Sequence, residues 1–117
     1  MTPEELKIRT KQFGLRVIRL VEALPKTQTA SVIGKQLLRC ATSVGANYRA
    51  VCKGRSKADF IAKLGVVEEE ADEAIYWLEM LVDAGIMKSK LVAELLAEAH
   101  ELTAIIAASR KTAKTKG

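Results

Sequence analysis

Apolar residues recur along this chain at alternating intervals of three and four positions, the spacing that places side chains on one face of an α-helix. The clearest run comprises Phe60, Leu64, Val67, Ala71, Ala74, Leu78 and Leu81. Two similar runs cover residues 6–24 and 33–51, and residues 91–106 are apolar on one side. The pattern therefore predicts four amphipathic helices.

The first two helices carry recognisable terminal signals. Thr2 and Glu5 have the spacing of a capping box, and Pro25 stands where the first apolar run stops. Hydroxyl side chains are favoured at helix starts, so Thr29 and Ser31 are the candidates for the start of the second helix. The two helices are predicted over residues 2–24 and from Thr29 or Ser31 to Cys52.

The other two helices are marked in the same way. Ser56 is a suitable cap for the third helix, and Gly85 can adopt the left-handed conformation that closes it. Ser89 is the expected cap of the fourth helix. The basic segment 113–117 is expected to be a disordered tail after a bundle that spans residues 1–112.

Short connections decide how these helices are arranged. Four helices joined by a few residues each favour antiparallel neighbours, since long crossovers do not fit between them. The chain has 117 residues, 49% of them hydrophobic, which suits one compact core. We predict an all-α fold, an up-down-up-down antiparallel four-helix bundle.

Charge is divided unevenly along the chain. Twelve basic and three acidic side chains occupy residues 1–57, whereas three basic and eleven acidic ones occupy residues 58–108. We find neither a secretory signal nor the roughly 18 to 20 apolar residues that a membrane span needs. Cys40 and Cys52 fall about 18 Å apart on one helix, beyond disulfide reach. These features favour a cytoplasmic protein with no membrane partner.

The apolar residues exceed what one bundle core needs. In a square bundle the first and third helices lie diagonally, and their outer faces carry opposite charge. Unlike and complementary faces favour head-to-tail contact between copies, which closes into a ring if the rotation permits. Off-centre packing within one bundle is the alternative. The predicted interface of this homo-oligomer comprises Ile8, Leu15, Ile18, Val66, Glu73, Trp77 and Met80.

The second helix contains no acidic residue and carries a basic stripe. Lys35, Arg39, Arg49 and Lys53 project within about 80° of one another, and Arg55 extends the stripe beyond the helix. Such a stripe suits contacts with the phosphates of RNA or DNA. No aromatic residue is interleaved, so stacking on single-stranded bases is not expected. A solvated helix face is the alternative.

No catalytic constellation, metal site or cofactor is predicted. His100 is the single histidine, and no Glu precedes it at the three-residue spacing of di-iron bundles. The carboxylates of residues 68–73 point around their helix instead of converging on a metal ion. We expect a protein that is not an enzyme.

Two signatures stand out in residues 33–81, namely SVGANYR and EEEADEAIYWLE. The whole segment, with RTKQFGLRVIRLVEALPK upstream, closely resembles the four-helix-bundle proteins of the 23S rRNA intervening-sequence protein family. The resemblance implies a bundle that assembles as a homopentamer. Related proteins include the accessory variability determinants of diversity-generating retroelements, which are basic pentamers associated with nucleic acid and a reverse transcriptase.

Two functions remain open at this point, and a carboxylate metal site, which stoichiometric metal in the purified protein would reveal, is a distant third. The first is a ring-forming accessory or scaffold protein that contacts RNA or DNA through the second helix and the C-terminal tail. The alternative is a structural or protein-interaction ring whose basic surface recruits an acidic protein. Salt-sensitive binding of random RNA or DNA distinguishes the two.

Overall fold

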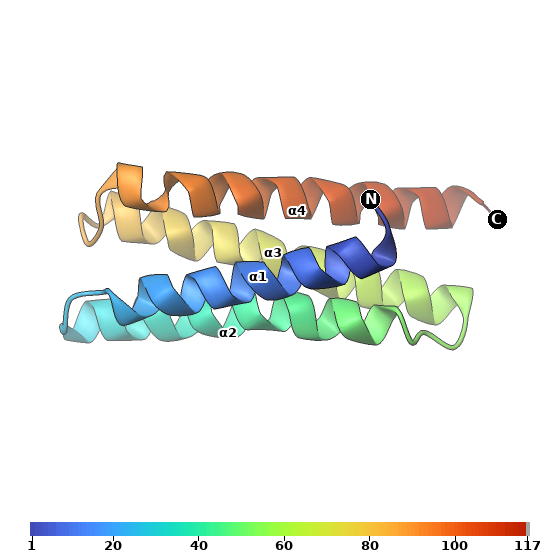
Figure 1. Ribbon diagram of the computed structural model, residues 1–117, viewed down its shortest axis with the longest axis horizontal. Coiled ribbons are helices and arrows are strands. Elements are labelled where there is room, and N and C mark those ends of the chain that lie inside the picture. The colour runs from blue at the N-terminus through green and yellow to red at the C-terminus, as the bar shows by residue number, and fades with distance from the viewer. Residues whose placement is uncertain (117) are drawn as a thin grey trace.

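Four long helices make up the computed structural model, which describes residues 1–116 (Figure 1). They lie side by side along a rod that measures 48 × 20 × 20 Å. The all-α bundle predicted from the sequence is confirmed. The helices are α1 (Pro3–Glu22), α2 (Gln28–Val51), α3 (Lys57–Asp83) and α4 (Ser89–Thr115).

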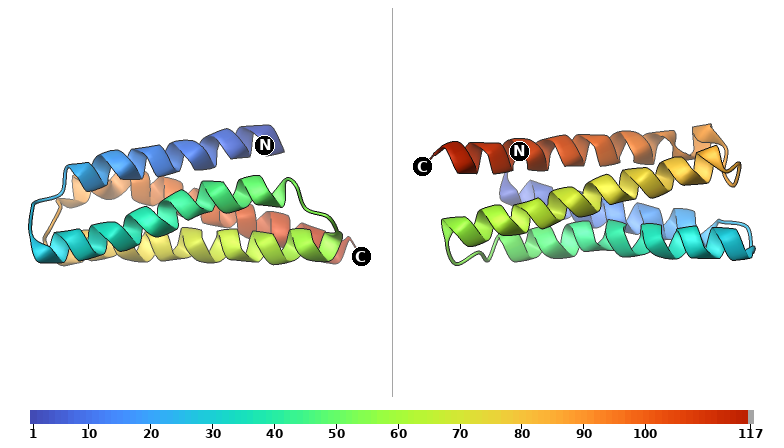
Figure 2. Two further views of the ribbon diagram at one scale, coloured as in Figure 1. Left: turned by 90° about the horizontal axis from the view of Figure 1, so that it is seen from below. Right: turned by 180° about the vertical axis from the view of Figure 1, so that it is seen from behind.

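Consecutive helices are neighbours in space (Figure 2). α2 packs between α1 and α3, α3 packs on α4, and α1 approaches α4 at few positions. Within the described residues the backbones of α1 and α3 do not come close to each other, so the predicted diagonal placement of these two helices is confirmed. Their outer faces therefore point in opposite directions.

Most helix-terminal signals act as predicted. The Thr2 hydroxyl accepts a hydrogen bond from the backbone N–H of Glu5 at 3.1 Å, and the Glu5 carboxylate accepts one from the N–H of Thr2 at 3.3 Å. The Ser56 hydroxyl accepts from the N–H of Asp59 at 3.1 Å. Gly85 follows α3 with a φ of 71°, the left-handed region that favours glycine.

Two predicted helix starts are wrong. α2 is capped by Thr27, whose hydroxyl accepts from the N–H of Ala30 at 3.1 Å. α4 begins at Ser89 itself, after an extended Lys88 that makes no side-chain cap. Thr27, Thr29 and Ser31 all satisfy the local rules for a cap, so the sequence alone does not select among them.

The predicted apolar faces form the core. Leu37, Leu64, Leu78 and Leu102 are fully buried, and Phe13 of α1 is only 1% exposed. Thr10 fills one step of the α1 pattern and is buried. Its hydroxyl is satisfied there because it donates to the Leu6 carbonyl of its own helix at 2.9 Å.

α4 continues through Thr115, so residues 113–115 of the predicted tail are helical in the structure. Arg110 ties this part of α4 to α3, since its guanidinium lies 3.4 Å from a Glu68 carboxylate oxygen. Gly117 of the predicted tail lies outside the described residues. None of the helices in residues 1–116 is long and apolar enough to cross a membrane.

Candidate functional site

Two glycines let the backbones of α1 and α2 approach closely. A Cβ atom at Gly45 would lie 3.3 Å from the backbone of Thr10, and one at Gly14 would lie 3.6 Å from the carbonyl oxygen of Ala41. A side chain at Gly45 would therefore push the two helices apart. Gly45 stands inside the signature SVGANYR, so helix packing accounts for that part of it.

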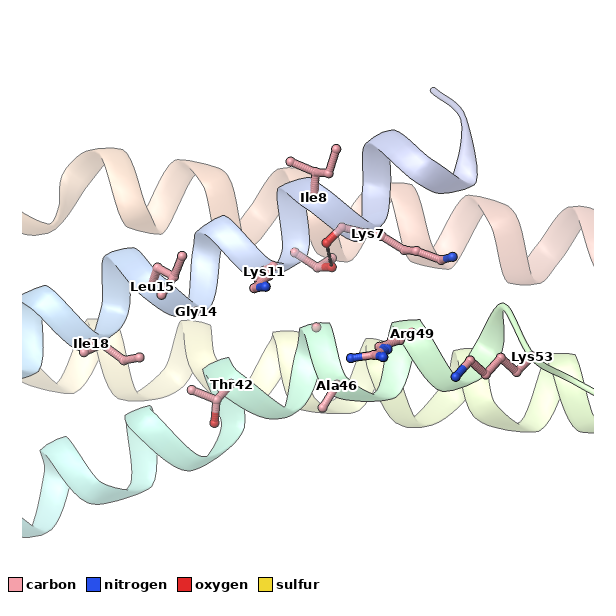
Figure 3. A pocket seen from close by; sticks show the side chains of 12 residues that line it. Lys7, Ile8, Lys11, Gly14, Leu15, Ile18, Thr42, Ala46, Arg49 and Lys53 are labelled. Atoms are coloured by element: carbon pink, nitrogen blue, oxygen red, sulfur yellow. Dashed lines mark hydrogen bonds between the residues drawn. The ribbon is translucent and has the colours of Figure 1, made fainter.

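Beside this contact, the outer faces of α1 and α2 form an open groove of about 570 Å³, which we call the α1/α2 groove (Figure 3). Three apolar side chains of α1 and four cations line it, two of them from α1, one from α2 and one from the residues just after α2. Most of these residues were predicted to belong to two separate sites, the oligomer interface and the basic stripe, and the fold brings them together in one groove. They are Ile8, Leu15 and Ile18 with Lys7, Lys11, Arg49 and Lys53.

Most of the positive charge in the α1/α2 groove is unpaired. The Lys7 ammonium lies 3.0 Å from a Glu4 carboxylate oxygen, and this hydrogen bond raises the pKa of Lys7. Lys11, Arg49 and Lys53 form no salt bridge within residues 1–116. No acidic side chain lines the groove, so its surface combines apolar side chains with an excess of positive charge.

The predicted basic stripe of α2 is interrupted in its middle. Arg39 turns toward α3, where its guanidinium donates to Glu73 at 2.5 Å and to Glu70 at 3.2 Å. Lys35 is exposed toward one end of the rod, beside the connection between α1 and α2. The stripe is therefore a set of separate cations, and Arg39 is engaged within the chain.

The α2–α3 connection and the last turns of α4, both rich in basic residues, lie at the other end of the rod (Figure 1). We call this region the basic end. Its cations are all exposed, and none forms a salt bridge within the described residues. The Asp59 carboxylate, also at this end, pairs with Lys63 at 3.1 Å. The cations of the basic end are Lys53, Arg55, Lys57, Lys111, Lys114 and Lys116.

The residues predicted to form an oligomer interface differ in exposure. Ile8 is 64% exposed and Val66 is 42% exposed. Glu73 is held by Arg39. The remaining four are half-buried, and Trp77 among them packs against the core; they are Leu15, Ile18, Trp77 and Met80.

Tyr76 is an exposed aromatic residue that was not among the residues predicted to form the oligomer interface. Its side chain is 53% exposed, and its ring meets the edge of Trp77 with 4.9 Å between the ring centroids. The indole Nε1 of Trp77 is buried and has no hydrogen-bond partner within residues 1–116. Tyr76 follows Val66 by ten positions, about 2.8 helical turns, so the two project about 80° apart on the outer side of α3, and this spacing was the available signal.

The two cysteines occupy different environments. Cys40 is buried, and burial raises the pKa of its thiol to about 12, whereas Cys52 is exposed. Only a thiolate reacts readily with disulfide reagents, and a raised pKa keeps Cys40 protonated at pH 8. We expect Ellman's reagent to modify one thiol per native chain and two in denaturant. The variant Cys52→Ser should show no rapid reaction; two rapidly reacting thiols in the native protein would contradict this assignment.

No metal centre is formed by the described residues. Within residues 1–116, no three His, Cys, Asp or Glu side chains are grouped so that they could hold a metal ion. His100 is exposed on α4.

The fold and these surfaces define an antiparallel four-helix bundle with a cation-rimmed groove and one basic end. The chain belongs to the family described as 23S rRNA-intervening sequence protein, which matches residues 4–108. The family resemblance read from the sequence is confirmed. The likeness to accessory variability determinants stays a prediction.

A solved structure is also similar. It is the crystal structure of a protein with unknown function from the S23 ribosomal protein family of Bacteroides thetaiotaomicron VPI-5482. The two chains are 32% identical over 95% of this chain and 99% of that one, with a TM-score of 0.87. None of the curated proteins matches this chain.

Proposed function

We propose that the protein is a non-enzymatic accessory or scaffold protein that binds the backbone of RNA or DNA through its basic end. The observation that supports this proposal is that the α2–α3 connection and the last turns of α4, which carry exposed cations without a salt bridge, lie at the same end of the rod. Exposed lysines and arginines bind phosphates by releasing counterions, which gives affinity without reading the base sequence. The description of the family, which refers to an intervening sequence of 23S rRNA, agrees with this class of partner.

Self-assembly forms part of the same proposal. A ring of identical chains repeats the basic end in every copy, so weak phosphate contacts add up to useful avidity. The ring, and the pentamer that the family resemblance implies, explain why exposed apolar side chains such as Ile8 remain on the surface of a single chain.

A structural or protein-interaction ring is the second candidate. It is favoured by the α1/α2 groove, whose apolar wall suits a protein partner better than a phosphate chain. An acidic protein would be the matching partner.

A matched pair of charge reversals tests nucleic-acid binding. Arg55→Glu with Lys57→Glu changes the basic end, and Lys88→Glu with Lys90→Glu makes the same change of charge at the start of α4, on the opposite end of the rod. Acidic residues are tolerated at both helix starts because they complement the helix dipole. We expect the first variant to retard random RNA or DNA more weakly at low salt, with a salt slope on duplex DNA about 1.8 smaller for two lost phosphate contacts.

The control variant should bind like the wild type. Equal binding by the two variants would remove the basic end as the site. A wild-type protein that retards neither RNA nor DNA would leave the protein-interaction ring as the function.

A further inference from the structure

The outer side of α3 carries acidic residues that have no partner in their own chain. Glu69, Asp72, Glu79 and Asp83 are exposed and form no salt bridge within residues 1–116. Two exposed side chains, Val66 and Tyr76, add apolar surface along the same side. We call this set the acidic face of α3.

The acidic face matches the α1/α2 groove in length. Val66 and Tyr76 are ten residues apart, about 15 Å along a helix. Ile8 and Ile18 on the wall of the groove have the same separation. The carboxylates of Glu69 and Asp72 lie between the two apolar side chains of α3, as Lys11 lies between the two isoleucines of α1.

The two surfaces also match in charge, and they cannot meet within one chain. The groove contains cations and no acid, whereas the acidic face contains four carboxylates and no base. α1 and α3 are diagonal in the bundle, so the groove and the acidic face point away from each other. A second copy of the chain supplies what each surface lacks.

We infer that the acidic face of α3 from a second copy packs lengthwise into the α1/α2 groove. This inference rests on the proposed self-assembly and names the two surfaces that carry it. The contact is head-to-tail, because each copy binds one neighbour through its acidic face and the other neighbour through its α1/α2 groove.

The orientation of the copies follows from this contact. Lengthwise packing keeps neighbouring rods side by side, and a closed ring requires that they point the same way. All basic ends then lie on one side of the ring. Arg55, Lys57, Lys111 and Lys114 lie outside the groove and stay accessible in the assembly.

A charge-swap experiment tests the contact by sedimentation velocity. The groove variant is Lys11→Glu with Arg49→Glu, and the face variant is Glu69→Lys with Asp72→Lys. Each variant places like charges against each other, so we expect the dissociation constant of the assembly to rise at least about 100-fold. The chain that carries all four changes restores opposite charges and should assemble within about tenfold of the wild type.

Two further samples sharpen the result. An equal mixture of the groove variant and the face variant should associate, because each variant complements the other. Lys88→Glu with Lys90→Glu changes the net charge as the groove variant does, but lies outside both surfaces; it should assemble like the wild type.

The outcomes separate the possible failures. A wild-type chain that is monomeric at 100 μM overturns the self-assembly and this contact with it. A wild-type assembly that neither variant weakens overturns the contact alone. Variants that fail to assemble and are rescued neither by the fourfold change nor by mixing also overturn it. Gel retardation is measured separately on variants of the basic end, and a variant that assembles like the wild type but loses retardation shows a failure of nucleic-acid binding and not of this contact.

Discussion

The substitution Phe13→Ala is expected to lower the free energy of unfolding by about 3–5 kcal/mol. Phe13 is 1% exposed and is the largest fully buried side chain of α1. α1 packs mainly on α2 and meets α4 at few positions. The ring of Phe13 is therefore a large part of the buried face that holds α1 on the bundle, and its removal leaves a cavity.

Urea unfolding followed by circular dichroism measures this loss. The chain concentration has to be held constant, because assembly would make the apparent stability depend on it. Gln12→Ala changes the adjacent, exposed residue and should shift the free energy of unfolding by no more than about 0.5 kcal/mol. A loss below about 1 kcal/mol for Phe13→Ala would show that this face of α1 is not packed as the structure has it.

The second large effect is expected at the seam between α1 and α4. Arg9 donates two hydrogen bonds to Glu98, from Nε at 2.7 Å and from Nη2 at 2.6 Å, and Nη2 also donates to Glu101 at 2.9 Å. The side chains of Arg9 and Glu98 are only 24% and 15% exposed. This bidentate pair connects two helices that otherwise touch little, so Arg9→Ala leaves a shielded carboxylate without its partner.

Removal of one partner from a fully buried pair costs about 3–5 kcal/mol. Water reaches this pair in part, and we therefore expect Arg9→Ala to cost about 2–3 kcal/mol of the free energy of unfolding. The double variant Arg9→Met with Glu98→Leu removes both charges and should stay within about 1 kcal/mol of the wild type. Glu101→Ala removes a partner that is 66% exposed and serves as the surface control.

A double variant as unstable as Arg9→Ala alone would show that the ion pair itself, and not the stranded carboxylate, accounts for the loss. Both predictions concern α1, which forms one wall of the α1/α2 groove. Substitutions that loosen α1 should therefore also weaken the proposed assembly.

The candidate site was predictable in its components and not in its arrangement. The sequence identified Ile8, Leu15 and Ile18 as surplus apolar residues and Arg49 and Lys53 as exposed cations, but it assigned the two groups to different partners. Lys7 and Lys11 escaped notice, because nothing in α1 alone shows that they face α2. Arg39 was assigned to the basic stripe, because only the packing of α3 on α2 brings Glu70 and Glu73 to its guanidinium.

The sequence by itself determined four helices, the inward face of each, and the diagonal placement of the first and third. These properties depend on the helical period and on short connections, which act within a helix or between consecutive ones. Only the tertiary structure decided which charges are paired, how the α1/α2 groove forms and where the basic end lies. These depend on the rotation and offset between helices, which close contacts such as that of Gly45 with the backbone of Thr10 set across the bundle.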